Sequence, residues 1–152
     1  MNRFFVFLYC LLVMILSSCS QDRIFEEFKP IISQSWGIED SLQFDLGKIN
    51  PSGHTSLIAI RFNEEYAFSN CYVRILSKDS LGTVLENKLV NIPLFDSKTG
   101  EPMGDGFGNT YTFYDSLPFQ FKEGAKSVII LQYMRENQLQ GIEAVGLKIL
   151  KQ

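Results

Sequence analysis

The sequence predicts an all-β fold: a single antiparallel β-sandwich, immunoglobulin-like or jelly-roll in topology, that follows a cleaved N-terminal segment. After Pro30, short apolar or alternating runs recur roughly every ten residues between turn-forming residues, which is typical of an all-β domain. No helical period of any length is present. A sheet that is apolar on one face must bury that face, and without an amphipathic helix a second sheet has to cover it.

The N-terminus has the features of a bacterial lipoprotein signal peptide. Arg3 is followed by an unbroken apolar run over residues 4–16, and Ser17, Ser18 and Cys19 come next. A helix of this run rises only about 20 Å, too little for a hydrocarbon core of about 30 Å, so a permanent transmembrane anchor is disfavoured. Two small residues before a cysteine form a lipobox. We therefore predict that residues 1–18 are removed and that Cys19 carries the lipid.

A lipid at Cys19 predicts a domain tethered to the membrane. Two or three acyl chains on one cysteine anchor a soluble domain stably, whereas one chain does not. Ser20 follows the cysteine, and in the sorting rule of two-membrane bacteria an aspartate there would retain the protein at the inner membrane. We therefore expect an outer-membrane anchor with the domain facing the periplasm. Residues 19–30 are predicted to be the lipidated N-terminus and tether, although the apolar residues among 24–28 could dock on the domain.

Residues 31–152 are expected to form the sandwich as one domain. Residues 42–46 alternate between apolar and polar, as in a half-buried strand, and residues 57–62 are apolar on both faces, as in a central strand. Proline and glycine in residues 51–54 predict the turn between them.

The remaining strands are predicted at residues 69–76, 83–85, 88–94, 110–114, 127–135 and 143–150. About eight strands in one domain imply two packed sheets. Pro93 cannot donate to a ladder, which predicts that the run at 88–94 lies at a sheet edge.

Charge and cysteine content narrow the classes of partner. The 152-residue chain has a formal net charge of −3, and loss of Arg3 makes the mature chain more acidic. No basic cluster remains that could neutralise several phosphates, so nucleic acid is not an expected partner. Cys71 would be the only thiol after cleavage and lipidation, which excludes an intramolecular disulfide. Its strand parity with Val73 predicts a buried position instead of a reactive one.

The longest irregular stretch, residues 96–109, is rich in aspartate and glycine. Carboxylate and amide oxygens could ligate a hard cation such as calcium, and the candidate ligands are Asp96, Glu101, Asp105 and Asn109. Their spacing does not fit an EF-hand loop. The alternative is a solvated turn followed by a tight crossing between sheets. We expect no bound metal, and Asp96 and Asp105 are the candidates should one bind.

The sequence does not predict an enzyme. His54 is the single histidine and stands in a turn, without a second histidine or glutamate at metal-binding spacing and without a nucleophile motif nearby. The glycines of residues 104–108 have the spacing of neither a Walker loop nor a dinucleotide fingerprint, and no helix follows them. No cofactor is expected.

Several segments in a fixed order carry a family resemblance. They are the lipobox cysteine, residues 24–28, Trp36, residues 92–96, the glycine-rich loop, and residues 132–136 leading to Gly141 and Ile142. Together they resemble the gliding motility lipoprotein family GldH over nearly the whole mature chain, most specifically from Leu94 to Gly146. The resemblance implies an envelope lipoprotein needed for gliding and associated with type IX secretion. It implies no catalytic residues.

Three Asp-Ser-Leu segments resemble the acceptor for periplasmic O-glycosylation, and their serines are Ser41, Ser80 and Ser116. The alternative is ordinary turn chemistry, in which the aspartate oxygen caps backbone amides at a strand boundary.

Two functions follow from these observations. The leading one is a lipid-anchored, non-catalytic component of the gliding and type IX secretion apparatus that docks on other envelope proteins, with Tyr111, Phe113 and Tyr114 as a candidate aromatic patch. The alternative is a carbohydrate-binding envelope lipoprotein that uses planar aromatic faces. Trp36, the only tryptophan, would be its natural platform, although a lone tryptophan beside an opening strand is more often in the core.

Overall fold

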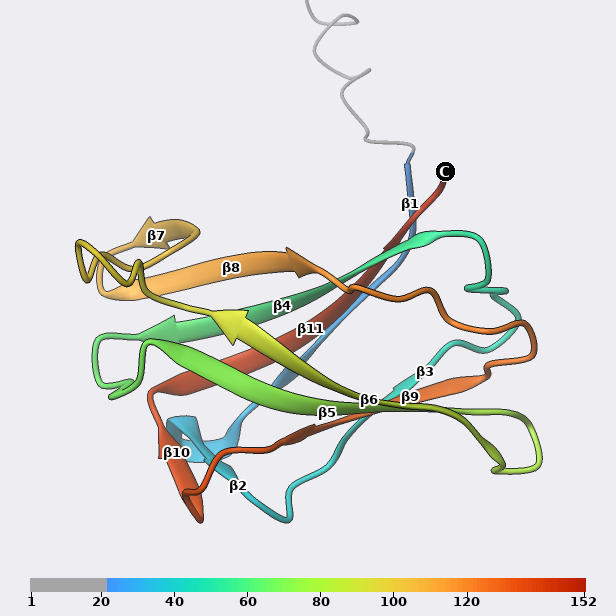
Figure 1. The fold of residues 1–152 in the computed structure, drawn as a ribbon, viewed down its shortest axis with the longest axis horizontal. Helices are drawn as coiled ribbons and strands as arrows, with labels where there is room; N and C mark the ends of the chain where they lie inside the picture. The colour runs from blue at the N-terminus through green and yellow to red at the C-terminus, as the bar shows by residue number, and fades with distance from the viewer. Residues whose placement is uncertain (1–21) are drawn as a thin grey trace, which may run out of the picture.

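The computed structural model describes residues 22–152, which form two main antiparallel sheets packed face to face (Figure 1). The first sheet has the strand order β1 (Arg23–Pro30), β11 (Ile142–Leu150), β4 (Thr55–Asn63), β8 (Thr110–Ser116) and β7 (Asp105–Phe107). The second has the order β3 (Leu42–Asp45), β9 (Ser127–Gln132), β5 (Asn70–Lys78) and β6 (Val84–Pro93). A short pair, β10 (Gln138–Gln140) and β2 (Ser35–Gly37), closes one end, beside the 3-10 turn Ile32–Gln34. The predicted antiparallel sandwich is confirmed.

The core lies between the inner faces of the two main sheets. Along β5 every second side chain is buried, which places Cys71, Val73 and Ile75 inside. Strand β4 supplies Ile58, Ile60 and Phe62 from the opposite sheet. Strand β5 thus buries one face and leaves the other face to the surface, as expected for a sandwich, whereas the central strand β4 also buries Ala59 on its outer face.

Most predicted strands are present with shifted ends. The two runs predicted at residues 83–85 and 88–94 are one continuous strand, β6, so the break between them was wrong. Strand β6 is an edge strand, as Pro93 predicted. The strand predicted at 127–135 ends at Gln132, because Met134 bends back and its amide donates to the Gln132 side chain at 2.8 Å.

The predicted tether is shorter than expected. Residues 23–30 form β1, which pairs with β11 along its whole length from Arg23 to Pro30, so this part of the assigned tether belongs to the domain. The signal peptide, residues 1–18, and Cys19 lie outside the described residues. Within residues 22–152, no helix has the length and apolar character to cross a membrane.

Cys71 and Trp36 are both core residues, as the sequence indicated. Burial raises the pKa of the Cys71 thiol to about 12, so the thiol stays protonated and unreactive. The Trp36 side chain is fully buried, and its Nε1 donates to the carbonyl oxygen of Asp40 at 2.9 Å. Trp36 therefore cannot serve as a platform for a sugar ring.

Candidate functional site

The three candidate glycosylation serines are all exposed. Ser41 precedes β3, Ser80 lies in the turn between β5 and β6, and Ser116 is the last residue of β8. Asp79 caps its turn, because its Oδ1 accepts hydrogen bonds from the amides of Leu81 and Thr83, each at 2.8 Å. The turn chemistry is thus present at Ser80, and the residue is nevertheless exposed.

The side chains of the candidate calcium ligands do not converge on one point, as the ligands of a cation site must. Asp96 accepts hydrogen bonds from the amides of Lys98 at 2.8 Å and Thr99 at 2.9 Å, and these bonds lower its pKa. Asp105 belongs to β7, where it pairs with Thr112 of β8. Among residues 22–152, no three acidic, histidine or cysteine side chains come together as a metal site would need.

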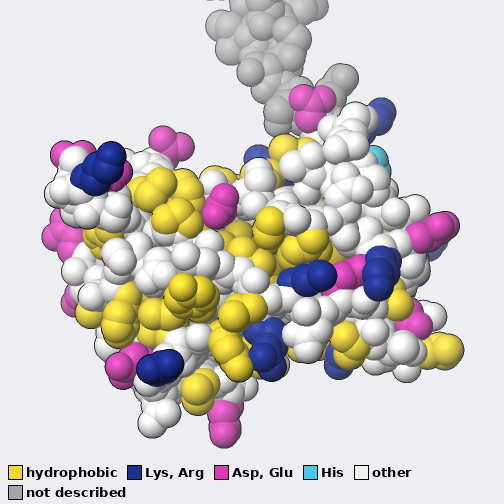
Figure 2. Space-filling model, viewed as in Figure 1, with side chains coloured by type: hydrophobic (Ala, Val, Ile, Leu, Met, Phe, Trp, Pro, Cys, Tyr) yellow, Lys and Arg dark blue, Asp and Glu magenta, His cyan; other side chains and the backbone are white. Residues whose placement is uncertain are grey.

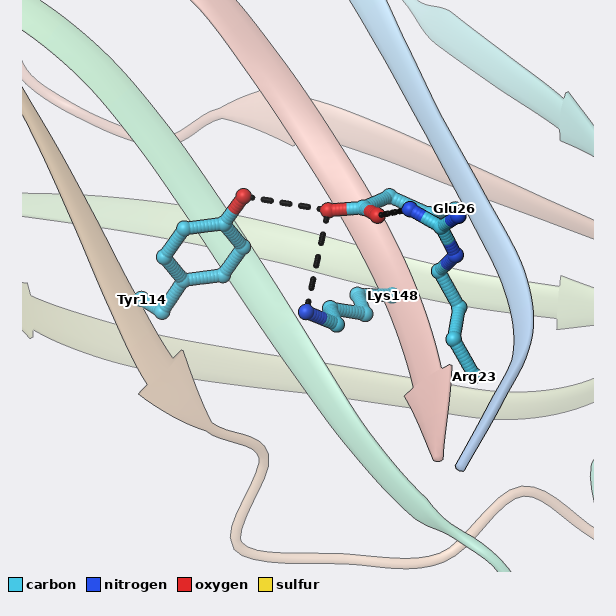
Figure 3. Close-up of polar contacts among 4 residues, drawn as sticks. All are labelled: Arg23, Glu26, Tyr114 and Lys148. Carbon is cyan, nitrogen blue, oxygen red and sulfur yellow. Dashed lines mark hydrogen bonds and ion pairs between the residues drawn. The ribbon is translucent and has the colours of Figure 1, made fainter. Parts of the chain in front are cut away.

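On the outer face of the five-stranded sheet, a polar network centres on Glu26. Figure 3 shows Arg23, Lys148 and Tyr114 converging on its carboxylate. Arg23 forms an ion pair with Glu26, the Tyr114 hydroxyl donates to it at 3.0 Å, and Lys148 Nζ lies 3.9 Å from Oε1. The hydrogen bond from Arg23 is the main cause that lowers the pKa of Glu26 below its ordinary value of 4.5. Burial and the bond to Glu26 raise the pKa of Tyr114.

Beside this network, Phe28 lies over the backbone of β11. Its ring occupies the space where a side chain at Gly146 would be, since a Cβ there would meet the ring at 2.8 Å. Tyr114 packs edge-on at 6.3 Å between ring centroids, and the Arg61 guanidinium lies 5.2 Å from the Phe28 centroid. Tyr114 therefore helps to close this face, while Tyr111 and Phe113 of the predicted aromatic patch pack partly against the core.

Changing Glu26 to Gln should make the free energy of unfolding depend less on pH in the acidic range. The lowered pKa in the folded state means that the ionised carboxylate contributes stability above about pH 4.5, and that this contribution is lost as pH falls through the folded-state pKa. We expect E26Q to lower the unfolding free energy by about 1 kcal/mol at pH 7 and to approach the parent protein near pH 3. Urea denaturation at both pH values measures this, and Tyr114→Phe should reproduce only part of it. An equal loss at both pH values would contradict the assignment.

The outer face of the four-stranded sheet carries a pocket of about 580 Å³, called here the arginine pocket. It is lined by Ile38, Arg74, Leu131, Gln132, Tyr133, Met134 and Arg135. The Arg74 guanidinium lies 4.2 Å from the centroid of the Tyr133 ring, close enough for a cation-π contact. The amide of Tyr72 points at the Met134 sulfur at 3.2 Å, which holds this side chain against the sheet.

Sequence reasoning did not find this pocket. The alternation along β5 places Arg74 on the outer face, but Ile38 reaches the same place only through the pairing of β2 with β10. Residues 132–135 belong to the strand predicted at 127–135 and to a segment of family resemblance, and neither observation indicates a pocket. The pocket is made by contacts across the fold that strand patterns do not specify.

These features define a class of small all-β domains in which two antiparallel sheets pack as a sandwich. Comparison with known proteins gives the family. The sequence profile of the GldH lipoproteins matches residues 23–149. The chain therefore belongs to the GldH lipoprotein family, which confirms the resemblance found in the sequence; the family is not known for an enzymatic activity.

Two relatives are similar over nearly their whole length. The gliding motility lipoprotein GldH homolog of Christiangramia forsetii is 29% identical over 164 residues, covering 99% of this chain and 97% of its own. The gliding motility lipoprotein GldH of Flavobacterium johnsoniae is 26% identical over 152 residues, covering 91% of each. Among solved structures, the VP2 subviral particle of infectious bursal disease virus covers 88% of this chain and 34% of its own, with 11% identity and a TM-score of 0.35, too low to define a shared fold.

Proposed function

We propose that this protein is a non-catalytic component of the apparatus for gliding motility and type IX secretion, held at the outer membrane by lipid on Cys19 and facing the periplasm. Family membership carries the proposal, because two relatives that match over nearly their full length are gliding motility lipoproteins. The position of Cys19 supports the anchor, since it lies only four residues before β1.

Its role in the apparatus is to dock on other envelope proteins. Large apolar side chains stand exposed on the second sheet, and Figure 2 shows hydrophobic side chains gathered over the first half of β5 and the end of β6, with Lys or Arg side chains among them. Exposed apolar groups that cluster in this way commonly mark protein contacts.

The test is deletion of the gene in a gliding host, followed by complementation with the native protein or with Cys19→Ala. We expect deletion to abolish colony spreading and to impair export of surface adhesins, and only the lipidated form to restore both. Cys10→Ala is the matched control, because Cys10 is removed with the signal peptide in this proposal. A deletion strain that spreads and exports normally would refute the function; full rescue by Cys19→Ala would refute only the anchor.

We further propose O-glycosylation at one or more of the exposed serines Ser41, Ser80 and Ser116. Their exposure in the folded domain leaves each hydroxyl open to a transferase. The intact mass of protein purified from envelopes should exceed that of the lipidated polypeptide, and the triple serine-to-alanine variant should lose the excess. A mass equal to the lipidated polypeptide alone would end this proposal.

A further inference from the structure

We propose that the arginine pocket binds an extended segment of another envelope protein in which an acidic side chain stands beside apolar ones. This inference rests on the proposed function, since it names the surface and the chemistry of one of the docking contacts. Three observations carry it: two arginines without acidic partners, the apolar rows around them, and the position of the pocket in the tethered domain.

The first observation is a local excess of positive charge on an acidic protein. Neither Arg74 nor Arg135 has a carboxylate within 4 Å among residues 22–152, where the ion pairs involve Glu26 and Glu27 of β1. The whole chain nevertheless carries a formal charge of −3. Two guanidinium groups beside one pocket therefore attract an anionic group, and guanidinium geometry suits a carboxylate in particular.

The second observation is the apolar frame around Arg74. Leu89 of β6 stands directly opposite it on one side and Leu131 of β9 on the other. Leu89 is 53% exposed, and Tyr133, which follows the end of β9, is 49% exposed. The centres of protein interfaces commonly combine apolar side chains with a few charged groups. Burial of these apolar side chains by a partner would also strengthen an ion pair between the arginines and a carboxylate of the partner. A purely polar anion would leave these side chains uncovered.

The third observation is the position of the pocket relative to the membrane anchor. Strand β1 begins at Arg23, next to the anchor, and its eight residues cover about 26 Å before Pro30. Ile38, which lines the pocket, directly follows β2, and Figure 1 shows β2 at the end of the sandwich opposite the start of β1. In the proposed tethered arrangement, the pocket thus lies toward the end of the domain that is far from the anchor, where a protein partner can reach it.

The size of the pocket fits a segment of a protein. Its volume of about 580 Å³ lies within the range of about 300–1,000 Å³ that well-formed ligand sites have. The exposed side chains of Tyr72 and Leu89 extend the surface along β5 and β6 beyond the pocket itself. A segment that places one apolar side chain in the pocket and a carboxylate between Arg74 and Arg135 would continue across this surface.

The experiment is photo-crosslinking of the full-length lipoprotein in a gliding host, with p-benzoylphenylalanine in place of Tyr72 at the rim of the pocket. The position control is the same residue at Phe107, which is 93% exposed in β7 of the other sheet. We expect position 72, and not position 107, to give one crosslinked partner peptide that contains Asp or Glu beside an apolar residue. Mass spectrometry of the crosslinked peptide identifies its sequence.

Charge reversal then tests the role of the arginines. Arg74→Glu with Arg135→Glu should lower the crosslink yield at least tenfold, and Asp or Glu→Arg in the partner peptide should restore it. Lys78→Glu with Lys126→Glu is the charge control, because it also reverses two charges, at the far end of β5, and it should keep the yield within about twofold. Arg74→Gln with Arg135→Gln provides a milder pair, and circular dichroism confirms that each variant is folded.

The proposal is overturned if the crosslink survives charge reversal, if the peptide has no acidic residue, or if position 72 captures a second copy of this chain, a glycan, lipid or nothing. Failure of the proposed function gives a different result, since the deletion strain would then spread normally. If deletion stops spreading while the charge-reversed protein restores it fully, the pocket has no role and the proposed function stands.

Discussion

Phe62→Ala is expected to lower the free energy of unfolding by about 3–5 kcal/mol. Phe62 is fully buried in β4, and its ring packs against Phe95 at 5.3 Å, Tyr111 at 5.8 Å and Tyr66 at 6.5 Å between centroids. Alanine would leave a cavity among these three rings. The rings cannot move in to fill the cavity, because each is fixed by the strand or loop that carries it. This loss is a large part of the roughly 5–15 kcal/mol by which such domains are stable.

Urea denaturation followed by circular dichroism measures the effect of Phe62→Ala. The matched control is Phe107→Ala in β7, which makes the same change at a side chain that is 93% exposed and should alter stability by less than about 0.5 kcal/mol. Equal effects of the two substitutions would mean that the aromatic cluster does not hold the two sheets together.

Gly141→Ala is expected to cost about 2–5 kcal/mol, because two unfavourable effects coincide at this position. Gly141 has a φ of +82°, which costs a residue with a Cβ about 1–2 kcal/mol. Its Cβ would also lie 2.4 Å from the amide nitrogen of Tyr66 and 2.9 Å from Asn63 Oδ1, and relief of this overlap costs about 1–3 kcal/mol more. The backbone cannot easily move away, since the Gly141 carbonyl accepts a hydrogen bond from Asn63 and its amide donates to Gln34.

Gly82→Ala separates the two effects. Gly82 has the same φ of +82°, but no atom lies within 4 Å of a Cβ placed there. The cost at Gly82 should therefore be about 1–2 kcal/mol. The difference between the two variants, measured by denaturation of both under the same conditions, gives the cost of the overlap. No difference would show that the junction of β4 and β10 adapts without strain.

The sequence could predict the sandwich because the central strands repeat apolar residues clearly. In β4, residues 57–62 are apolar at every position except Arg61, and β5 alternates without a break, so the physical signal for both is strong. Turn residues fix the approximate ends of these strands. The pattern does not specify the order of the strands in each sheet. Any strand with one apolar face could pair with any other such strand and still bury that face.

Strands at the sheet edges were harder to predict. The sequence places β1 in the tether because Glu26 and Glu27 interrupt its apolar residues. In the structure, ion pairs with Arg23 and Lys148 stabilise the Glu26 carboxylate on the sheet surface, so a charged residue is compatible with a strand there. Polar residues such as Asn87 likewise split β6, an edge strand, into two apparent runs. The strands β2, β7 and β10 have three residues each, too few to show any alternation.

The arginine pocket could not be predicted from the sequence, because it too depends on which strands lie side by side. Its residues come from three parts of the chain, near 38, at 74 and at 131–135, and only tertiary pairing gathers them. The family was recognisable earlier because similarity in order and spacing accumulates over the chain, whereas a surface site depends on a few side chains whose neighbours the sequence does not reveal.

The pairing of β1 with β11 also determines how the domain would respond to mechanical force. Its ladder hydrogen bonds run perpendicular to the strands. With Cys19 lipidated and a partner bound at the opposite end, as proposed above, tension along β1 would load the bonds from Arg23 to Pro30 in shear, all at once. A pull across the sheet would instead peel them apart one after another at lower force. In the proposed arrangement, β1 would therefore carry the mechanical load between the membrane anchor and the bound partner.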